Sequence, residues 1–181
     1  MRGVVVYESM FGNTRRVAEM ITQALADAME VRLLRADAVV AEDVQGIDLL
    51  VVGAPTHAWS MPRPNTRKGA PNNVRRPGSD LVLEPNADTS PGVREWLETL
   101  DDVHALAAVF DTRFNAPVML TGRAATGIEK ALQQHGFVMM SASESFRVDR
   151  QNHLLAGEVE RASRWGRRLG EEAAARLKVT P

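Results

Sequence analysis

Short apolar runs that do not alternate with polar residues recur along the chain. They cover Gly3 to Tyr7, Val31 to Leu34, Ile47 to Gly53, Ala105 to Phe110 and Phe137 to Met140. Continuous apolar runs of this length are typical of strands that are buried on both faces, as in parallel sheets. The pattern therefore predicts five parallel strands.

Helical periodicity fills the intervals between these runs. Apolar residues recur at helical spacing over 17–28, 38–44, 92–100, 125–135 and 155–173. Gly136 follows the fourth of these segments and is expected to close that helix as a C-terminal cap. Strands that alternate with helices predict a doubly wound α/β fold, with residues 1–181 forming a single domain.

The segment Arg63 to Pro91 breaks this alternation. It is rich in proline, glycine and asparagine, contains five basic residues, and is much longer than a usual connection. Two interpretations of this insert, at about 63–91, are open. It is either a surface excursion that the fold tolerates, or a lid or partner-docking element beside the strand ends.

Composition excludes several classes of protein. The 181 residues are 44% hydrophobic, which suits one domain with a sizeable core. A formal net charge of −1 argues against a nucleic-acid binder, which needs a basic surface. No apolar run approaches the length of a membrane span and no signal-peptide pattern is visible, so we expect a cytoplasmic protein without a membrane partner. The absence of cysteine excludes disulfides and thiolate chemistry.

Polar loops follow three of the predicted strands. They are Glu8 to Thr14 (ESMFGNT), Ala54 to Pro64 (APTHAWSMPRP) and Asp111 to Asn115 (DTRFN). Ligands of open α/β sheets bind outside the carboxyl ends of the strands. If the strand order is 2-1-3-4-5, strands one, three and four are neighbours, and the three loops converge on one crevice.

The first of these loops suits a phosphate group. The hydroxyls of Ser9 and Thr14 can donate hydrogen bonds, Gly12 allows a close approach of the backbone, and the start of the following helix favours an anion. The loop has neither the lysine of GxxxxGK[ST] nor the pattern GxGxxG. Because serine and asparagine are also ordinary helix caps, a turn with a cap is the alternative interpretation.

Several motifs, in order along nearly the whole chain, resemble the flavodoxin-like family. SMFGNT after VVVY resembles its phosphate loop, GAPTHAW its second loop and FDTR its third, while TGRAATGIEKALQQHG and GEVERASRWGRRL occupy family-like positions. The resemblance implies a flavodoxin-like, doubly wound three-layer sandwich with a five-stranded parallel sheet of order 2-1-3-4-5. It also implies flavin mononucleotide (FMN) as the cofactor.

Carried over residue by residue, the resemblance implies three groups of cofactor-binding residues. The phosphate would be surrounded by Ser9, Met10, Phe11, Gly12, Asn13 and Thr14. One side of the flavin ring would be lined by Pro55, Thr56, His57, Ala58 and Trp59, and the other by Phe110, Asp111, Thr112, Arg113 and Phe114. The four histidines show no metal-ligand spacing, and no catalytic residue is assigned.

The resemblance implies an FMN-binding redox protein that transfers electrons to a redox partner protein. Two departures from the family pattern keep alternatives open: His57 and Ala58 intervene before Trp59, and Arg113 stands where small or acidic residues are common. One alternative is an FMN-dependent NAD(P)H:quinone-type reductase with a small electron acceptor. Another is an interaction module that has lost FMN. The sequence leaves open the electron donor, the oligomeric state and whether the protein is an enzyme.

Overall fold

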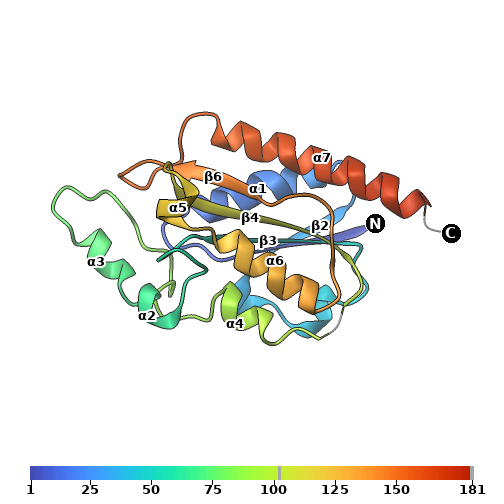
Figure 1. Ribbon diagram of the computed structural model, residues 1–181, viewed down its shortest axis with the longest axis horizontal. Coiled ribbons are helices and arrows are strands. Elements are labelled where there is room, and N and C mark those ends of the chain that lie inside the picture. Colours follow the sequence, from blue (N-terminus) through green and yellow to red (C-terminus); the bar gives the residue numbers. More distant parts are fainter. Residues whose placement is uncertain (102, 180–181) are drawn as a thin grey trace.

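The computed structural model describes residues 1–101 and 103–179, in which strands and helices alternate along most of the chain (Figure 1). The strands are β1 (Arg2–Tyr7), β2 (Glu30–Arg35), β3 (Leu49–Pro55), β4 (Leu106–Phe114), β5 (Val138–Met139) and β6 (Glu144–Val148). The α-helices are α1 (Asn13–Leu25), α2 (Pro64–Arg67), α3 (Ala70–Val74), α4 (Val93–Leu97), α5 (Val118–Thr121), α6 (Ala124–Gln134) and α7 (Glu158–Val179). Two 3₁₀ turns, η1 (Ala36–Ala38) and η2 (Ala41–Val44), follow β2.

The strands form one parallel sheet of order β2-β1-β3-β4-β5, and β6 also pairs with β4. Leu106 of β4 is paired with Val138 of β5, and Phe110, farther along β4, is paired with Glu144 of β6. The two short strands therefore share the fifth position of the sheet. The predicted order 2-1-3-4-5 is confirmed. The sheet has six strands rather than five, because the pairing with β4 is interrupted between β5 and β6.

Helices cover both faces of the sheet and make the three-layer arrangement that the sequence predicted. In Figure 1, α1 and α7 lie above the sheet and α4 and α6 below it. Ile21 of α1 and Trp165 of α7 are buried against one face, while Trp96 of α4 and Ile128 of α6 are buried against the other. Both faces are thus withdrawn from water, which accounts for the continuous apolar runs in the strands.

Several predicted helices have different bounds in the structure. The helix expected over 38–44 consists of two 3₁₀ turns, that expected over 92–100 is only α4, and the last helix begins at Glu158. Gly136 does follow α6 with a left-handed backbone (φ 84°), as expected of a glycine after a helix. Within the insert at 63–91, the short helices α2 and α3 were not predicted, since they lack an apolar face long enough to show a helical period.

The third predicted loop, Asp111 to Asn115, is wrong in its bounds. Strand β4 continues to Phe114, because Thr112 pairs with Pro55 of β3 and Arg113 pairs with Arg147 of β6. Hydrogen bonds to two neighbouring strands thus keep this polar segment extended. The connection to α6 begins only after Phe114 and contains α5.

Candidate functional site

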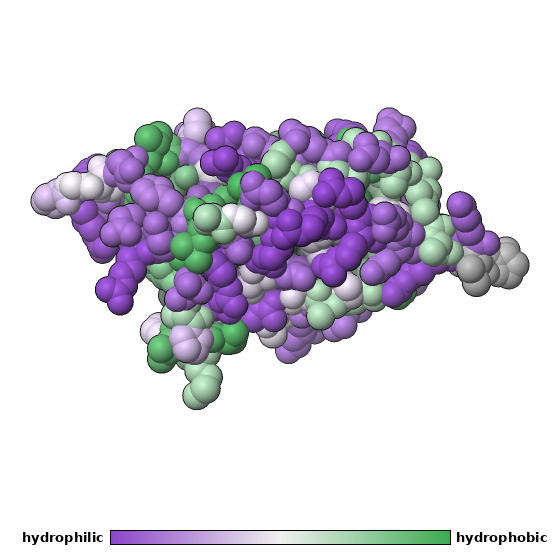
Figure 2. All heavy atoms as spheres, turned by 90° about the horizontal axis from the view of Figure 1, so that it is seen from above, coloured by the Kyte–Doolittle hydropathy of each residue, from purple (hydrophilic) through white to green (hydrophobic). Residues whose placement is uncertain are grey.

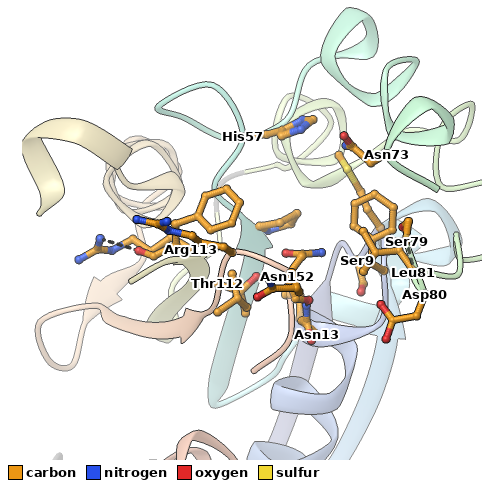
Figure 3. A pocket seen from close by; sticks show the side chains of 18 of the residues that line it. Ser9, Asn13, His57, Asn73, Ser79, Asp80, Leu81, Thr112, Arg113 and Asn152 are labelled. Carbon is orange, nitrogen blue, oxygen red and sulfur yellow. Dashed lines mark hydrogen bonds between the residues drawn. The ribbon is translucent and has the colours of Figure 1, made fainter. Parts of the chain in front are cut away.

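A cavity of about 480 Å³ opens at the carboxyl ends of β1, β3 and β4 (Figure 3). Its walls come from the loop after β1, the loop after β3, the end of β4, the insert and the loop after β6. None of the helices in the described part of the chain has the length and hydrophobicity that a membrane span requires. No group of three histidine or acidic side chains suited to a metal ion occurs among residues 1–101 and 103–179.

Most of the residues that the sequence nominated lie together at this cavity. Those that line it are Ser9, Met10, Phe11, Asn13, Thr14, Pro55, Thr56, His57, Thr112, Arg113 and Phe114. The nominated residues that do not line it are Gly12, Ala58, Trp59, Phe110 and Asp111.

Phe110 and Asp111 are placed inside the protein by the extension of β4. Phe110 is fully buried and packs edge-to-face against Phe146 and Trp165 in the core. The carboxylate of Asp111, also fully buried, accepts a hydrogen bond of 3.1 Å from the backbone N–H of Ala125. These two residues therefore support the cavity wall from behind rather than forming its surface.

The loop after β1 is held by hydrogen bonds within itself and to β4. The backbone N–H of Gly12 donates to Oγ of Ser9 at 3.1 Å, and Oγ1 of Thr14 lies 2.8 Å from Oγ1 of Thr112. Gly12 has a left-handed backbone (φ 88°), which is a conformation that favours glycine. As the residue before α1, Gly12 provides no side-chain cap, and the first turn of α1 contains no acidic residue. The start of α1 therefore remains suited to an anion.

The loop after β3 turns sharply beside the end of β4. Thr56 donates its backbone N–H to the carbonyl of Thr112 at 2.8 Å, and its hydroxyl accepts a hydrogen bond from the N–H of Ala124. His57 and Ser60 exchange backbone hydrogen bonds, and between them Ala58 and Trp59 adopt left-handed conformations. Trp59 is 66% exposed, so its indole is directed largely toward solvent.

His57 is a polar residue of the cavity wall with an unused ring nitrogen. Its Nδ1 is buried and has no hydrogen-bond partner among the described residues. Burial lowers the pKa of His57 from its ordinary value of 6.5, so the ring is neutral at pH 7. A neutral imidazole can donate one hydrogen bond and accept another.

The insert provides a wall that the sequence analysis did not identify by residue. Its lining residues are Asn73, Arg76, Pro77, Gly78, Ser79, Asp80 and Leu81, and Figure 3 shows Ser79 and Leu81 across the cavity from Arg113. Farther along the insert, the N–H of Glu84 donates to the carbonyl of Met10 at 2.8 Å, and its carboxylate pairs with Arg15 at 2.7 Å. The unusual length of the segment was the available signal, but only the fold shows which part faces the cavity.

The loop after β6 forms the remaining wall, which was missed because β6 itself was not predicted. Val148 at the end of β6 also lines the cavity, and the loop contributes Arg150, Gln151 and Asn152. The side-chain amide of Asn13 donates to the carbonyl of Asn152 at 2.6 Å, which joins this loop to the loop after β1. His153 lies 3.2 Å from Asp80 and joins it to the insert.

The charge of the cavity favours an anionic ligand. Arg76, Arg113 and Arg150 line it, and Asp80 is the acidic residue among the described lining residues. The carboxylate of Asp80 is itself hydrogen-bonded to the ring of His153. Within the described contacts, the side chains of Arg76 and Arg150 form no ion pair or hydrogen bond, so their charges are available to a ligand.

Fold and site together define a flavodoxin-like α/β protein with an anion-favouring cavity at the carboxyl ends of its central strands. Residues 4–66 match the family model of the flavodoxin domain. Over 66 residues the chain is 36% identical to a flavodoxin of Aquifex aeolicus, a match that spans 33% of this chain and 36% of that relative.

Similar solved structures extend the likeness to nearly the whole chain. A flavodoxin from the domain Archaea has a TM-score of 0.63 at 15% identity, covering 96% of this chain and 99% of its own. Oxidised flavodoxin 2 from Bacillus cereus has a TM-score of 0.63 at 21% identity, with coverages of 97% and 99%. A flavodoxin, WrbA-like protein from Agrobacterium tumefaciens has a TM-score of 0.60 at 16% identity, with coverages of 96% and 98%. The chain is thus flavodoxin-like in sequence over residues 4–66 and in fold beyond them, which confirms the resemblance and the fold class.

Proposed function

We propose that the cavity binds FMN and that the protein is a redox protein that passes electrons to a partner protein. The observation that carries this proposal is the convergence of the SMFGNT loop with the ends of β3 and β4 on one cavity. When bound, FMN supplies the redox chemistry, because no protein side chain in this cavity is itself redox-active. The contribution of the chain is to bind, orient and surround the cofactor.

The residues of the loop after β1 fit a phosphate group. The hydroxyl of Ser9 accepts from Gly12 and keeps its own hydrogen to donate, and α1 starts without a side-chain cap or an acidic residue. The cationic side chains of Arg76 and Arg150 add a favourable charge to the same cavity. Thr14 is 1% exposed and already bonded to Thr112, so we assign it to holding the loop in shape rather than to direct contact.

We assign the ring system to the part of the cavity between the loop after β3 and the end of β4. His57 with its unused Nδ1, Thr56 and Phe114 lie there, so that polar atoms and an aromatic surface are both available. Trp59 lies just outside this wall. We propose that its exposed indole covers the flavin ring from the solvent side, since stacked aromatic rings bury a large apolar area.

Binding of FMN and of riboflavin, which lacks the phosphate, tests this assignment. In Ser9→Ala, the loss of a hydrogen bond to a charged group, about 1.5–3 kcal/mol, should weaken FMN about tenfold or more and leave riboflavin little changed. Trp59→Ala should weaken both ligands alike. Flavin fluorescence titrations measure these affinities. Equal losses for both ligands in Ser9→Ala would contradict the phosphate assignment, and a protein that takes up no FMN would support the interaction-module alternative.

The insert supports a second candidate, an FMN-dependent NAD(P)H:quinone-type reductase. Asn73 and the residues from Arg76 to Leu81 line the cavity, an arrangement that suits enclosure of a small substrate against the cofactor. The FMN-loaded protein should then oxidise NADH or NADPH in the presence of a soluble quinone without any partner protein. Failure with both nucleotides would leave the electron-transfer protein as the proposal.

A further inference from the structure

Arg113 and Arg147 form a pair of like charges beside the cavity. They are direct partners in the register of the parallel strands β4 and β6, and residues paired in this way lie about 4.8 Å apart and point to the same face of the sheet. Arg113 is 3% exposed and lines the cavity, where Figure 3 labels it on the side opposite the insert. The charge of Arg147 acts unfavourably on that of Arg113, and like charges on directly paired residues repel each other unless a negative charge lies nearby.

The protein contacts hold Arg113 in position without cancelling its charge. Its Nε donates to Oγ of Ser145 at 3.2 Å, and its Nη1 donates to the carbonyl of Ala116 and to Oγ1 of Thr121, both at 2.8 Å. These partners are all neutral. The side chain of Arg147 forms no hydrogen bond with any described residue, and its Nη1 is buried.

The carboxylate of Glu158 accepts a hydrogen bond from the backbone N–H of Arg147 at 2.8 Å, but it is already paired with the guanidinium of Arg161 at 2.6 Å. The carboxylate that acts on the charge of Arg113 is that of Asp111. It faces not only Arg113 but also a third guanidinium, that of Arg123, at 3.9 Å, and it accepts a hydrogen bond at the start of α6. Burial, followed by the charge of Arg147, lowers the pKa of Arg113, whereas Asp111 acts in the opposite direction. Positive charge therefore exceeds negative charge on this wall.

Uncompensated charge in a poorly solvated place is costly, and an anionic partner removes the cost. We propose that Arg113 and Arg147 stabilise the negative charge that a flavin in this cavity gains on reduction. The inference rests on the proposed binding of FMN. Two electrons and one proton added to the neutral ring leave one negative charge, and a nearby pair of guanidiniums favours that form over the neutral oxidised ring. The midpoint potential of the bound flavin is thereby raised.

The test is the two-electron midpoint potential of the FMN complex, measured by titration with a chemical reductant against a reference dye. Arg147→Gln is the main variant, because it removes a charge but no hydrogen bond that the structure shows. In this variant the affinity for reduced flavin should fall about tenfold more than the affinity for oxidised flavin. This ratio corresponds to a fall of about 30 mV in the midpoint potential of a two-electron couple. Arg113→Gln should lower the potential at least as much, and Arg113→Lys, which keeps the charge, should recover most of the loss.

Arg167→Gln is the matched control, since Arg167 is exposed on α7 and bonds to Ser163 of its own helix. Its potential should equal that of the unchanged protein. Equal potentials in the unchanged protein and in Arg147→Gln, or an equal fall in Arg167→Gln, would overturn the inference. If Arg113→Gln does not fold, Arg147→Gln decides alone. Failure of the unchanged protein to bind FMN would instead refute the proposed function, so the two failures are distinguishable.

Discussion

Replacement of Arg67 by methionine should detach the insert from the sheet and destabilise the protein. Arg67 ends α2 and is almost fully buried, with its side chain 4% exposed. Its guanidinium lies 2.9 Å from the carboxylate of Glu95 on α4 and 3.5 Å from that of Glu8, which directly follows β1. Glu8 also accepts a hydrogen bond of 2.9 Å from the N–H of Val93. Arg67 thus joins the insert, α4 and the cavity loop at one point.

The expected cost follows from the burial of Glu8. Removal of one partner from a buried ion pair costs about 3–5 kcal/mol, because the other charge is left without compensation. Melting temperatures of domains of this size change by about 2–4 °C per kcal/mol, so we expect a fall of roughly 6–20 °C. Glu8→Gln in the Arg67→Met background removes the isolated charge and should restore at least about 1 kcal/mol.

The pH dependence gives this prediction an independent check. Burial raises the pKa of Glu8 above its ordinary value of 4.5, while Val93 and Arg67 act to lower it. A carboxyl whose pKa is raised on folding loses stability as the pH rises through its folded pKa. Without Arg67 the pKa of Glu8 rises further, so Arg67→Met should cost more at pH 7 than at pH 4.

Urea unfolding of the single and double variants at both pH values measures these free energies. A loss below about 1 kcal/mol in Arg67→Met at pH 7 would refute the reasoning. The reasoning would also be refuted if Arg67→Met lost as much stability with Glu8→Gln as with Glu8 itself. The destabilisation would then not come from an uncompensated charge on Glu8.

Three further variants test the site and the packing around it. Because burial lowers the pKa of His57 in the folded protein, only the unfolded chain should bind a proton at this residue as the pH falls below 6.5, and the unchanged protein should lose stability. His57→Gln lacks this group, so in urea unfolding it should lose less stability between pH 7.5 and 5.5 than the unchanged protein. Gly53→Ala should lower the melting temperature, since a Cβ there overlaps the ring of Phe110, and Phe110→Leu in the same chain should restore part of the loss. Gly166→Ala places a Cβ 2.9 Å from the carbonyl oxygen of Ile21, so calorimetry should show destabilisation although alanine favours a helix by about 1 kcal/mol.

The surface adds a feature that the sequence pattern did not suggest. Val118, Met119 and Leu120 of α5 are 47%, 92% and 68% exposed, and Trp59 lies beside Gly122 at the end of the same connection. Figure 2 shows a mainly hydrophilic face over α7, with the most hydrophobic side chains gathered toward the end of the molecule away from the C-terminus. Apolar residues in a short exposed connection have no helical or strand period, so their exposure could not be foreseen.

The candidate site was predictable where one stretch of chain carries its own signal. The loop after β1 combines hydroxyls with Gly12 between a buried strand and a helix, and the structure places most of it at the cavity. The end of β4 was misassigned because Asp111 and Arg113 are polar, yet both are buried among partners distant in the sequence. Pairing with β3 and β6 keeps this segment in a strand, although its polar residues locally favour a loop.

Local sequence alone determined the buried strands, the main helices α1, α6 and α7, and the loop after β1. These features depend on interactions between residues close in the chain and on the division between apolar and polar positions, which can be read in order. The tertiary structure alone decided that β5 and β6 share one position in the sheet, that the insert forms a wall of the cavity, and that Arg113 is paired with Arg147. Those outcomes join segments separated by tens of residues, and the energy that selects them comes from contacts that exist only once the sheet has formed.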